Sequence, residues 1–501
     1  ALIYPKFASI GTDGVFYALM AKSLAEGGGL SVFHHAMVYF SPLLSVVIVP
    51  FYWLIGNIDV AAHITVIVLG LLSLPFFYYA LRSFVERRVA AVATLFLAVN
   101  ATVVWRNLRP VAQPLAAFLS VVLFFLLTKY IEIDKQRPKV FVLSFLLGLV
   151  AGALYLTRPE YIVLIVPLSL FLFWVNCSSV ALKRNLLIVL AAVFGFILCA
   201  TPYIIFLHNE TGQWTFTGRL SVQILAAQGQ SLSSSGSVIV STVPQGNPAM
   251  VFLDNIVDRK FLKIYFSNLY DIERILLRTF GVIGFAFFGI GLLKVFREKR
   301  YAVLGALAVP ASVLFGLAIG HTGENGYIAP YLFLFIALIG VGCYEVIVEI
   351  FNVFASAQWK RSLSAVVVVV MSMTYFAFPL FQNLLFRPAE TAKPVEYQLL
   401  GSWFHRNVEN PQNQVIAARK PEIAFHADAD WMEISGKETP SEILQMMNAN
   451  GATYLAIDTR SLGKDAERLV DKDGKFSEKR LEFVYRIDYF DQHVYLYRLT
   501  Q

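Results

Sequence analysis

Residues 140–176 read VFVLSFLLGLVAGALYLTRPEYIVLIVPLSLFLFWVN, two apolar runs separated by the charged pair Arg158 and Glu160. Each run approaches the length that a helix needs to cross the hydrocarbon core of a bilayer. The stretch therefore predicts two membrane-spanning helices, with an arginine and a glutamate at the membrane surface where they meet.

The same apolar pattern recurs along most of the chain. The protein has 501 residues, 57% of them hydrophobic, and a mean hydropathy of +0.62, which is too apolar for a soluble enzyme. We expect a mainly α, polytopic helical membrane protein over residues 1–386. Its spans are expected at about 60–81, 89–105, 110–128, 140–157, 160–176, 186–207, 280–296, 301–320, 328–350 and 363–385.

The composition changes after residue 386, because residues 387–501 are rich in Lys, Asp, Glu, Asn and Gln. Alternating and helical periodicities predict one small α/β domain here. No catalytic constellation is visible in it, so we expect it to bind an acceptor or to cover the active site. Strands are expected at 414–418, 453–457, 481–487 and 493–499, and helices at 395–407 and 441–450.

The charges of the connecting loops orient the spans. Every second loop is basic, and basic loops face the cytoplasm. These loops are 82–88, 129–139, 183–184, 297–300 and 360–361. The remaining loops and the C-terminal α/β domain are therefore expected to be extracytoplasmic, in a prokaryotic plasma membrane. The net charge of +7 mostly reflects the cytoplasmic loops, so it does not indicate a nucleic-acid partner.

Residues 1–59 are also expected on the outer face, as juxtamembrane helices. That placement predicts a further membrane helix ahead of residue 1, which is Ala rather than Met. Segment 41–57 is short and contains Pro42 and Pro50. A span there would invert every later loop against the charge rule, so we interpret it as a juxtamembrane helix at the outer interface.

Asp13 is a candidate functional acid in the stretch GTDGVFYALMAKSLAEGGG (11–29). Apolar residues at helical spacing predict a short amphipathic helix that the three glycines end. Thr12 or Asp13 is expected to cap its start. The alternative, which composition alone favours, is that Asp13 only caps the helix.

Three arginines lie at outer helix ends, where the charge rule disfavours cations. Arg106 and Arg109 occur in WRNLRP, and Arg158 in TRPEY. A guanidinium group matches phosphate geometry and keeps its charge, so the three predict an anion site. Arginines that only reach toward headgroups and pair with nearby carboxylates are the alternative.

A divalent metal site is a further hypothesis. His34 and His35 follow the glycine run, and His208 and His321 mark other outer helix ends. Asp13, Glu160 and Glu324 are outer carboxylates that could join them. No spacing imposes such a site, and interfacial histidines that only form hydrogen bonds are the alternative.

The outer loop 208–279 is long enough to carry function. Its end, 249–280, has helical periodicity with basic and aromatic residues. It is interpreted either as a segment that orders over a bound acceptor or as a passive surface helix.

The chain lacks the motifs of several enzyme classes. It contains no phosphate-binding P-loop, no GxSxG and no HExxH, and its glycine run follows no strand. Its three cysteines form no disulfide framework or metal motif.

The order of four short motifs resembles the GT-C glycosyltransferases, closest to the protein O-mannosyltransferase and aminoarabinose transferase branch. The motifs are TDGVFYALMAKSLAEG (12–27), YFSPLLSVVIVPFYWLIG (39–56), WRNLRP (105–110) and TRPEY (157–161). The resemblance covers roughly residues 1–350.

This resemblance implies an inverting glycosyltransferase that takes a sugar from a polyprenyl phosphate on the outer face and transfers it to an acceptor hydroxyl. The family's catalytic Asp lies in the first outer loop, and Asp13 matches it. Arginines at the outer surface hold the donor phosphate, and Arg106, Arg109 and Arg158 are the candidates. The acceptor is a lipid, a glycan or a protein. Further candidates for substrate contact are Tyr39, Glu160, His321 and Glu324.

The sequence departs from the family pattern at three places. Many relatives have a second acidic residue after the catalytic Asp, where this chain has Gly14. The residues before Pro42 are Tyr39, Phe40 and Ser41 rather than a Lys or Glu. The late Arg-Tyr pair of relatives is Gly326 and Tyr327 here.

Two other classes of protein remain as alternatives. A transporter or flippase of lipid-linked sugars would have internal repeats and charges near the bilayer midplane. Here the charges gather at outer helix ends and no repeat is evident, which favours an enzyme. A non-catalytic membrane assembly protein is the other alternative, for which the outer domain is the main argument.

Overall fold

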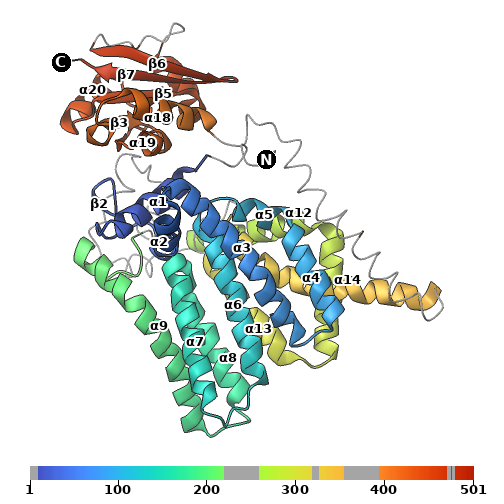
Figure 1. Cartoon of the computed structure of the whole chain (residues 1–501). Helices are drawn as coiled ribbons and strands as arrows, with labels where there is room; N and C mark the ends of the chain where they lie inside the picture. The colour runs from blue at the N-terminus through green and yellow to red at the C-terminus, as the bar shows by residue number, and fades with distance from the viewer. Residues whose placement is uncertain are drawn as a thin grey trace.

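The computed structural model describes residues 9–218, 259–318, 326–354, 370, 394–470, 476 and 480–500. A helical bundle carries a small α/β domain at one end (Figure 1). The elements up to residue 354 are α1 (Thr12–Ala25), β1 (Ser31–Val32), β2 (His35–Ala36), α2 (Leu43–Ile55), α3 (Ile58–Arg82), α4 (Arg87–Val99), α5 (Ala101–Asn107), α6 (Ala112–Glu132), α7 (Lys139–Thr157), η2 (Pro159–Leu164), α8 (Ile165–Asn176), α9 (Leu182–Thr211), α12 (Arg259–Arg297), α13 (Tyr301–Leu317), η3 (Ala329–Tyr331) and α14 (Leu332–Phe354).

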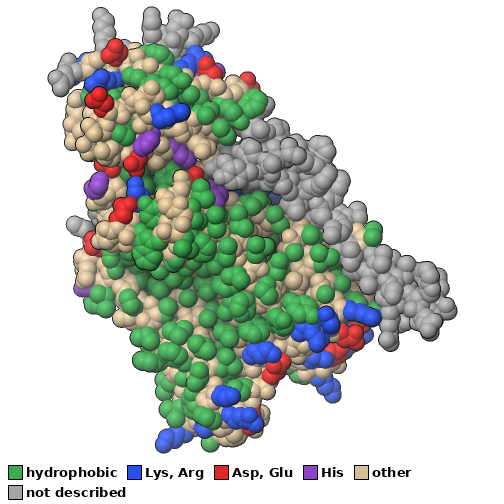
Figure 2. Space-filling view, viewed as in Figure 1, with side chains coloured by type: hydrophobic (Ala, Val, Ile, Leu, Met, Phe, Trp, Pro, Cys, Tyr) green, Lys and Arg blue, Asp and Glu red, His purple; other side chains and the backbone are tan. Residues whose placement is uncertain are grey.

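The polytopic helical fold predicted from the sequence is confirmed. In the described part of the chain, seven helices are long and apolar enough to cross a membrane, and the bent pair α4–α5 would make an eighth. Hydrophobic side chains cover the flank of the bundle, as the lipid-facing surface of a membrane protein requires (Figure 2). The expected span at 363–385 lies outside the described residues, except for residue 370.

One expected span is broken. Residues 89–105 were expected to form one continuous helix, but α4 and α5 meet at an angle of 59°. Asn100 causes the break, because its buried side chain accepts hydrogen bonds from the backbone N–H groups of Thr102 and Val103 and so starts a new helix. The hydropathy of the segment carries no sign of this cap.

Segment 41–57 contains helix α2, which has 13 residues. At 1.5 Å per residue it is too short to cross the bilayer, as the charge argument predicts. Trp53 and Leu54 near its end are exposed, with 69% and 84% of their surface accessible. An apolar, exposed end suits a helix that lies in the membrane interface.

Glycines allow α7 and α9 to touch along their backbones. A Cβ at Gly148 would lie 1.9 Å from the carbonyl oxygen of Ala192, and one at Gly195 would lie 2.4 Å from that of Phe145. Small residues at such crossings are the usual means by which membrane helices approach closely. These two helices therefore form a tightly packed pair in the bundle.

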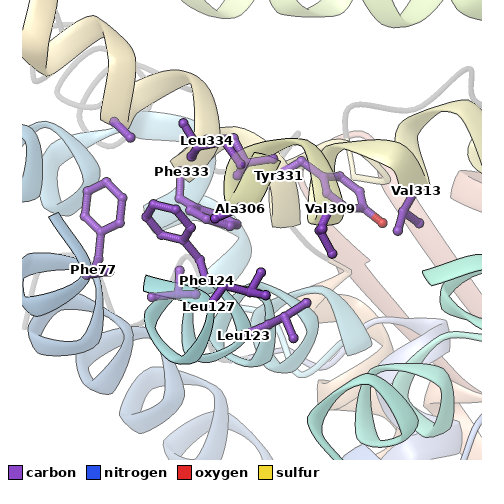
Figure 3. Close-up of a cluster of buried hydrophobic side chains, with 14 of the residues drawn as sticks. Phe77, Leu123, Phe124, Leu127, Ala306, Val309, Val313, Tyr331, Phe333 and Leu334 are labelled. Carbon is purple, nitrogen blue, oxygen red and sulfur yellow. The ribbon is translucent and has the colours of Figure 1, made fainter. Parts of the chain in front are cut away.

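Aromatic and aliphatic side chains fill the centre of the bundle (Figure 3). Phe77 of α3 and Phe124 of α6 both contact Phe333 of α14, with ring centroids 6.1 and 6.0 Å apart. Ala306, Val309 and Val313 of α13 complete the cluster. Helices from both halves of the sequence thus share one core.

The C-terminal α/β domain is also confirmed, with one strand more than expected. Its sheet has the order β4-β3-β5-β7-β6, in which β4, β3 and β5 are parallel and β7 and β6 are antiparallel. The unexpected strand is β4, a parallel edge strand of four residues. The elements are α18 (Val395–Asn407), η5 (Pro411–Asn413), β3 (Val415–Ala418), α19 (Glu422–Ala427), β4 (Asp430–Glu433), α20 (Pro440–Ala449), β5 (Tyr454–Asp458), α21 (Thr459–Leu462), α22 (Lys464–Leu469), β6 (Leu481–Tyr489) and β7 (Gln492–Leu499).

The α/β domain packs on the end of the bundle formed by α1 and α2 (Figure 1). Side chains of α18, α19 and one face of the sheet share an apolar core with α1, α2 and α3. The other face of the sheet is covered by α20 together with α21 and α22. Lys and Arg side chains gather at the opposite end of the bundle (Figure 2).

The close approach of α7 and α9 makes a testable prediction. Gly148→Ala forces its Cβ into a backbone oxygen, which cannot rotate away, so the helices must separate. Such overpacking costs about 1–3 kcal/mol. We expect a lower thermal midpoint for the purified protein in detergent. Gly289→Ala in α12 is the matched control, because nothing lies within 4 Å of its added Cβ. Equal midpoints for the two variants would contradict this packing.

Candidate active site

A cavity with about 400 Å³ of empty volume, part of it open to solvent, lies at the end of the bundle that carries the α/β domain. It brings together Asp13, Tyr39 and Arg158, three of the residues expected to be functional. They come from α1, from the segment before α2, and from the junction of α7 and η2. The other residues lining it are Tyr17, Phe40, Ser41, Ala112, Gln113, Thr157, Pro159 and Tyr327.

Asp13 lies in the first turn of α1, but it does not cap the helix. The N-cap is Gly11, which has no side-chain cap hydrogen bond, so the expectation that Thr12 or Asp13 caps the helix is wrong. The alternative interpretation, in which Asp13 only caps the helix, is wrong for the same reason. A carboxylate in the first turn still benefits from the positive end of the helix dipole. The helix ends at Ala25, before the glycines, as expected.

Among the described residues that line the cavity, Arg158 is the one cation. It lies between α7 and η2 in extended backbone, and only 4% of its surface is exposed. Its Nε donates to Oε1 of Glu160 at 2.5 Å, and its guanidinium carbon lies 4.6 Å from the ring centroid of Tyr327. Carboxylate and ring together fix the plane of the guanidinium group. Glu160 thus orients Arg158 without lining the cavity itself.

The departure at Gly14 has a steric cause. A Cβ at this position would lie 2.7 Å from a side-chain carbon of Ile10 and 3.0 Å from the ring of Pro110. Helix α1 therefore packs against the end of the WRNLRP motif, and no second carboxylate fits after Asp13.

Arg106 and Arg109 are not among the described residues that line the cavity. The guanidinium of Arg109 lies 4.8 Å from the ring centroid of Trp105. A Cβ at Gly326 would come within 2.8 Å of three guanidinium atoms of Arg106. Arg106 therefore occupies the space beside Gly326, next to Tyr327 of the cavity. Their phosphate-binding role stays a prediction.

Within the residues that the structure describes, no group of three or more His, Cys, Asp or Glu side chains could hold a metal ion. His34 is exposed, and its Nε2 lies 3.5 Å from Oδ1 of Asp430 in the α/β domain. The described donors near His34 and His35 therefore do not fit a metal. His321 and Glu324 lie outside the described residues.

Sequence reasoning did not select Gln113 or Tyr327 as site residues. Gln113 is a polar residue in the first turn of the mostly apolar helix α6, three positions after the end of WRNLRP, and this contrast is a usable signal. Tyr327 matches the tyrosine of the late Arg-Tyr pair in the family pattern described above.

The α/β domain contacts α1 along its length. Thr12 Oγ1 donates to Oε1 of Glu422 at 2.8 Å, and Lys22 Nζ pairs with Asp428 at 3.0 Å. Between them, the rings of Phe16 and Trp431 lie 6.0 Å apart in an edge arrangement. The helix that carries Asp13 is therefore held by the α/β domain.

Comparisons with known proteins give the same fold. The sequence model of the dolichyl-phosphate-mannose-protein mannosyltransferase family matches residues 37–205. ArnT from Cupriavidus metallidurans in the apo state has a similar structure, with a TM-score of 0.60 and 13% identity, covering 99% of this chain and 95% of that one. This chain has a GT-C-like fold.

Two further solved structures show the same fold. One is the same ArnT bound to undecaprenyl phosphate, with a TM-score of 0.59 and 13% identity, covering 99% of this chain and 95% of that one. The other is the oligosaccharyltransferase AglB from Archaeoglobus fulgidus, in complex with an inhibitory peptide and a dolichol-phosphate. It has a TM-score of 0.60 and 11% identity, covering 94% of this chain and 70% of that one. None of the curated proteins is similar to the chain in sequence. With seven helices in its described part that are long and apolar enough to cross a membrane, the chain is an integral membrane protein.

The Glu422 contact predicts a pH-dependent stability. Burial raises the pKa of Glu422 from 4.5 to about 7, although the Thr12 hydroxyl and Lys420 oppose the shift. A carboxyl with a raised folded-state pKa favours folding below pH 4.5, and this contribution is lost as the pH rises through 7. A shift of this size is on the order of 3 kcal/mol. As the pH rises from 5 to 8, the thermal midpoint of the wild-type protein should fall relative to that of the Glu422→Gln variant. If the thermal midpoints of the two proteins changed with pH in the same way, the raised pKa would be contradicted.

Proposed function

We propose that this chain is a GT-C glycosyltransferase that moves a sugar from a polyprenyl phosphate to an acceptor hydroxyl, with inversion, on the extracytoplasmic face of a plasma membrane. The observation that carries this proposal is one cavity lined by both Asp13 and Arg158. A base for the acceptor and a cation for the departing phosphate are the two groups that such a transfer needs.

The chemistry follows from these two groups. The carboxylate of Asp13 takes the proton of the acceptor hydroxyl as its oxygen attacks the anomeric carbon. The bond between that carbon and the phosphate oxygen breaks, and its electron pair stays on the phosphate. The leaving polyprenyl phosphate therefore gains a negative charge, which the guanidinium of Arg158 stabilises. Glu160 and Tyr327 keep that guanidinium in place before the reaction.

A second, more apolar cavity, with about 300 Å³ of empty volume that includes open solvent, is the candidate for the start of the prenyl chain. It is lined by Leu97, Val103, Pro114 and Phe333, among others. Both cavities are lined by the first turn of α6, through Gln113 in the cavity of Asp13 and Pro114 in the apolar one.

The extracytoplasmic side is supported by charge. Basic side chains gather at the end of the bundle opposite the α/β domain (Figure 2), and basic ends face the cytoplasm. The cavity and the α/β domain then share the outer face. The acceptor there is a lipid, a glycan or a protein, and the α/β domain is the surface that it meets first.

Replacing Asp13 tests the function. Asp13→Asn keeps the shape of the side chain but removes the base, so we expect transfer to fall by about 10²–10⁴-fold. The measurement is the release of radiolabelled sugar from undecaprenyl-phosphate mannose, glucose or aminoarabinose by the protein in detergent. Glu26→Gln is the matched control, because Glu26 lies at the other end of the same helix. This variant should release sugar at the wild-type rate. Normal release by Asp13→Asn would contradict the proposal.

Replacing Arg158 tests donor binding. Hydrogen bonds to charged groups contribute about 1.5–3 kcal/mol, so Arg158→Ala should weaken the binding of undecaprenyl phosphate by about 10- to 100-fold. Fluorescence titration of the purified protein measures this. Arg184→Ala is the control, because Arg184 bonds the backbone carbonyls of Lys135 and Gln136 in a basic loop. An unchanged affinity in Arg158→Ala would remove Arg158 from the phosphate site.

A further inference from the structure

The first turn of α1 is held from outside the helix. Its N-cap, Gly11, provides no side-chain acceptor for the free N–H groups of the turn. The hydroxyl group of Thr12 donates a hydrogen bond to Glu422, the first residue of α19 in the α/β domain. The residues are 410 positions apart in sequence, and Thr12 directly precedes Asp13.

Glu422 is an unusual residue to find at this junction. Only 3% of its surface is exposed, although a carboxyl group is costly to bury. Its Oε2 has no hydrogen-bond partner among the described residues, and Thr12 is the side chain that donates to Oε1. We interpret its hydrogen bond with Thr12 as a contact that fixes geometry.

A second contact links the same helix to the cavity wall. Phe16, one turn after Thr12, meets Trp431 of β4 on one side. On its other side Phe16 stacks on Phe40, with ring centroids 5.3 Å apart, and Phe40 lines the cavity. The α/β domain therefore contacts α1 on the two turns nearest to Asp13.

We propose that Glu422 is a positioning residue for sugar transfer, which acts through Thr12 to fix the direction of the Asp13 carboxylate toward the cavity. This inference rests on the proposed role of Asp13 as the base. A base must be held within a fraction of an ångström of its productive position, and misplacement by about 1 Å can cost about 10²-fold in rate. The α/β domain is then part of the catalytic geometry rather than only a cover or an acceptor surface.

The inference predicts a separation of rate from donor binding. Thr12→Val removes the hydroxyl at nearly constant volume, so kcat should fall at least tenfold. The Kd for undecaprenyl phosphate should stay within twofold, since Arg158 is untouched. Thr12→Ser and Glu422→Gln each keep the hydrogen bond and should retain most of kcat. The assay is sugar release from the labelled undecaprenyl-phosphate sugars, with the protein in detergent.

A double-mutant cycle tests whether the two residues act as one unit. Thr12→Val combined with Glu422→Leu should be no slower than the slower single variant, because both remove the same interaction. Asp428→Asn is the control, because it breaks the exposed bridge to Lys22 at the far end of α1 and should leave kcat unchanged.

Three results would overturn the inference: a kcat of Thr12→Val within twofold of wild type, a Thr12→Ser variant as slow as Thr12→Val, or additive losses in the cycle. Each of these counts against positioning only if Asp13→Asn is inactive. If Asp13→Asn is instead fully active, the proposed function itself is wrong. The two failures are therefore distinguishable in one set of assays.

Discussion

The site depends on one buried guanidinium group at the break between two apolar helices. Arg158 is 4% exposed, and a cation in such a place is costly unless an anion and hydrogen bonds compensate it. Glu160 and Tyr327 provide the carboxylate and the aromatic face. Their geometry leaves Arg158 on the cavity wall with Thr157 and Pro159. Intramembrane and interfacial charges that a fold retains at such cost usually serve function.

A different kind of packing places Asp13 in the same cavity as Arg158. Asp13 lies on a short helix outside the spans, and Gly14 lets that helix approach Pro110 of the bundle. On its other side the same helix shares an apolar core with the α/β domain. Segments far apart in sequence therefore line one cavity. Tertiary packing can thus assemble a specific site even though each local motif is weak.

The fold could be predicted from hydropathy and charge because a bilayer leaves few alternatives to apolar helices. Helix 395–407 was predicted with its observed bounds, since its amphipathic pattern is local. The break at Asn100 and the strand β4 were missed, because one depends on a single cap and the other on pairing with β3. In the site, Asp13, Tyr39 and Arg158 come together as expected. Gln113 was missed, and Arg106 and Arg109 lie off the cavity wall, because side-chain direction at a helix end follows from tertiary packing.

The most direct test of the account is an experimental structure of the protein with undecaprenyl phosphate bound. The account predicts phosphate oxygens within hydrogen-bonding distance of the Arg158 guanidinium, in the cavity that Asp13 lines. A phosphate bound at the opposite, basic end of the bundle, with Arg158 still covered by Glu160 and Tyr327, would contradict it.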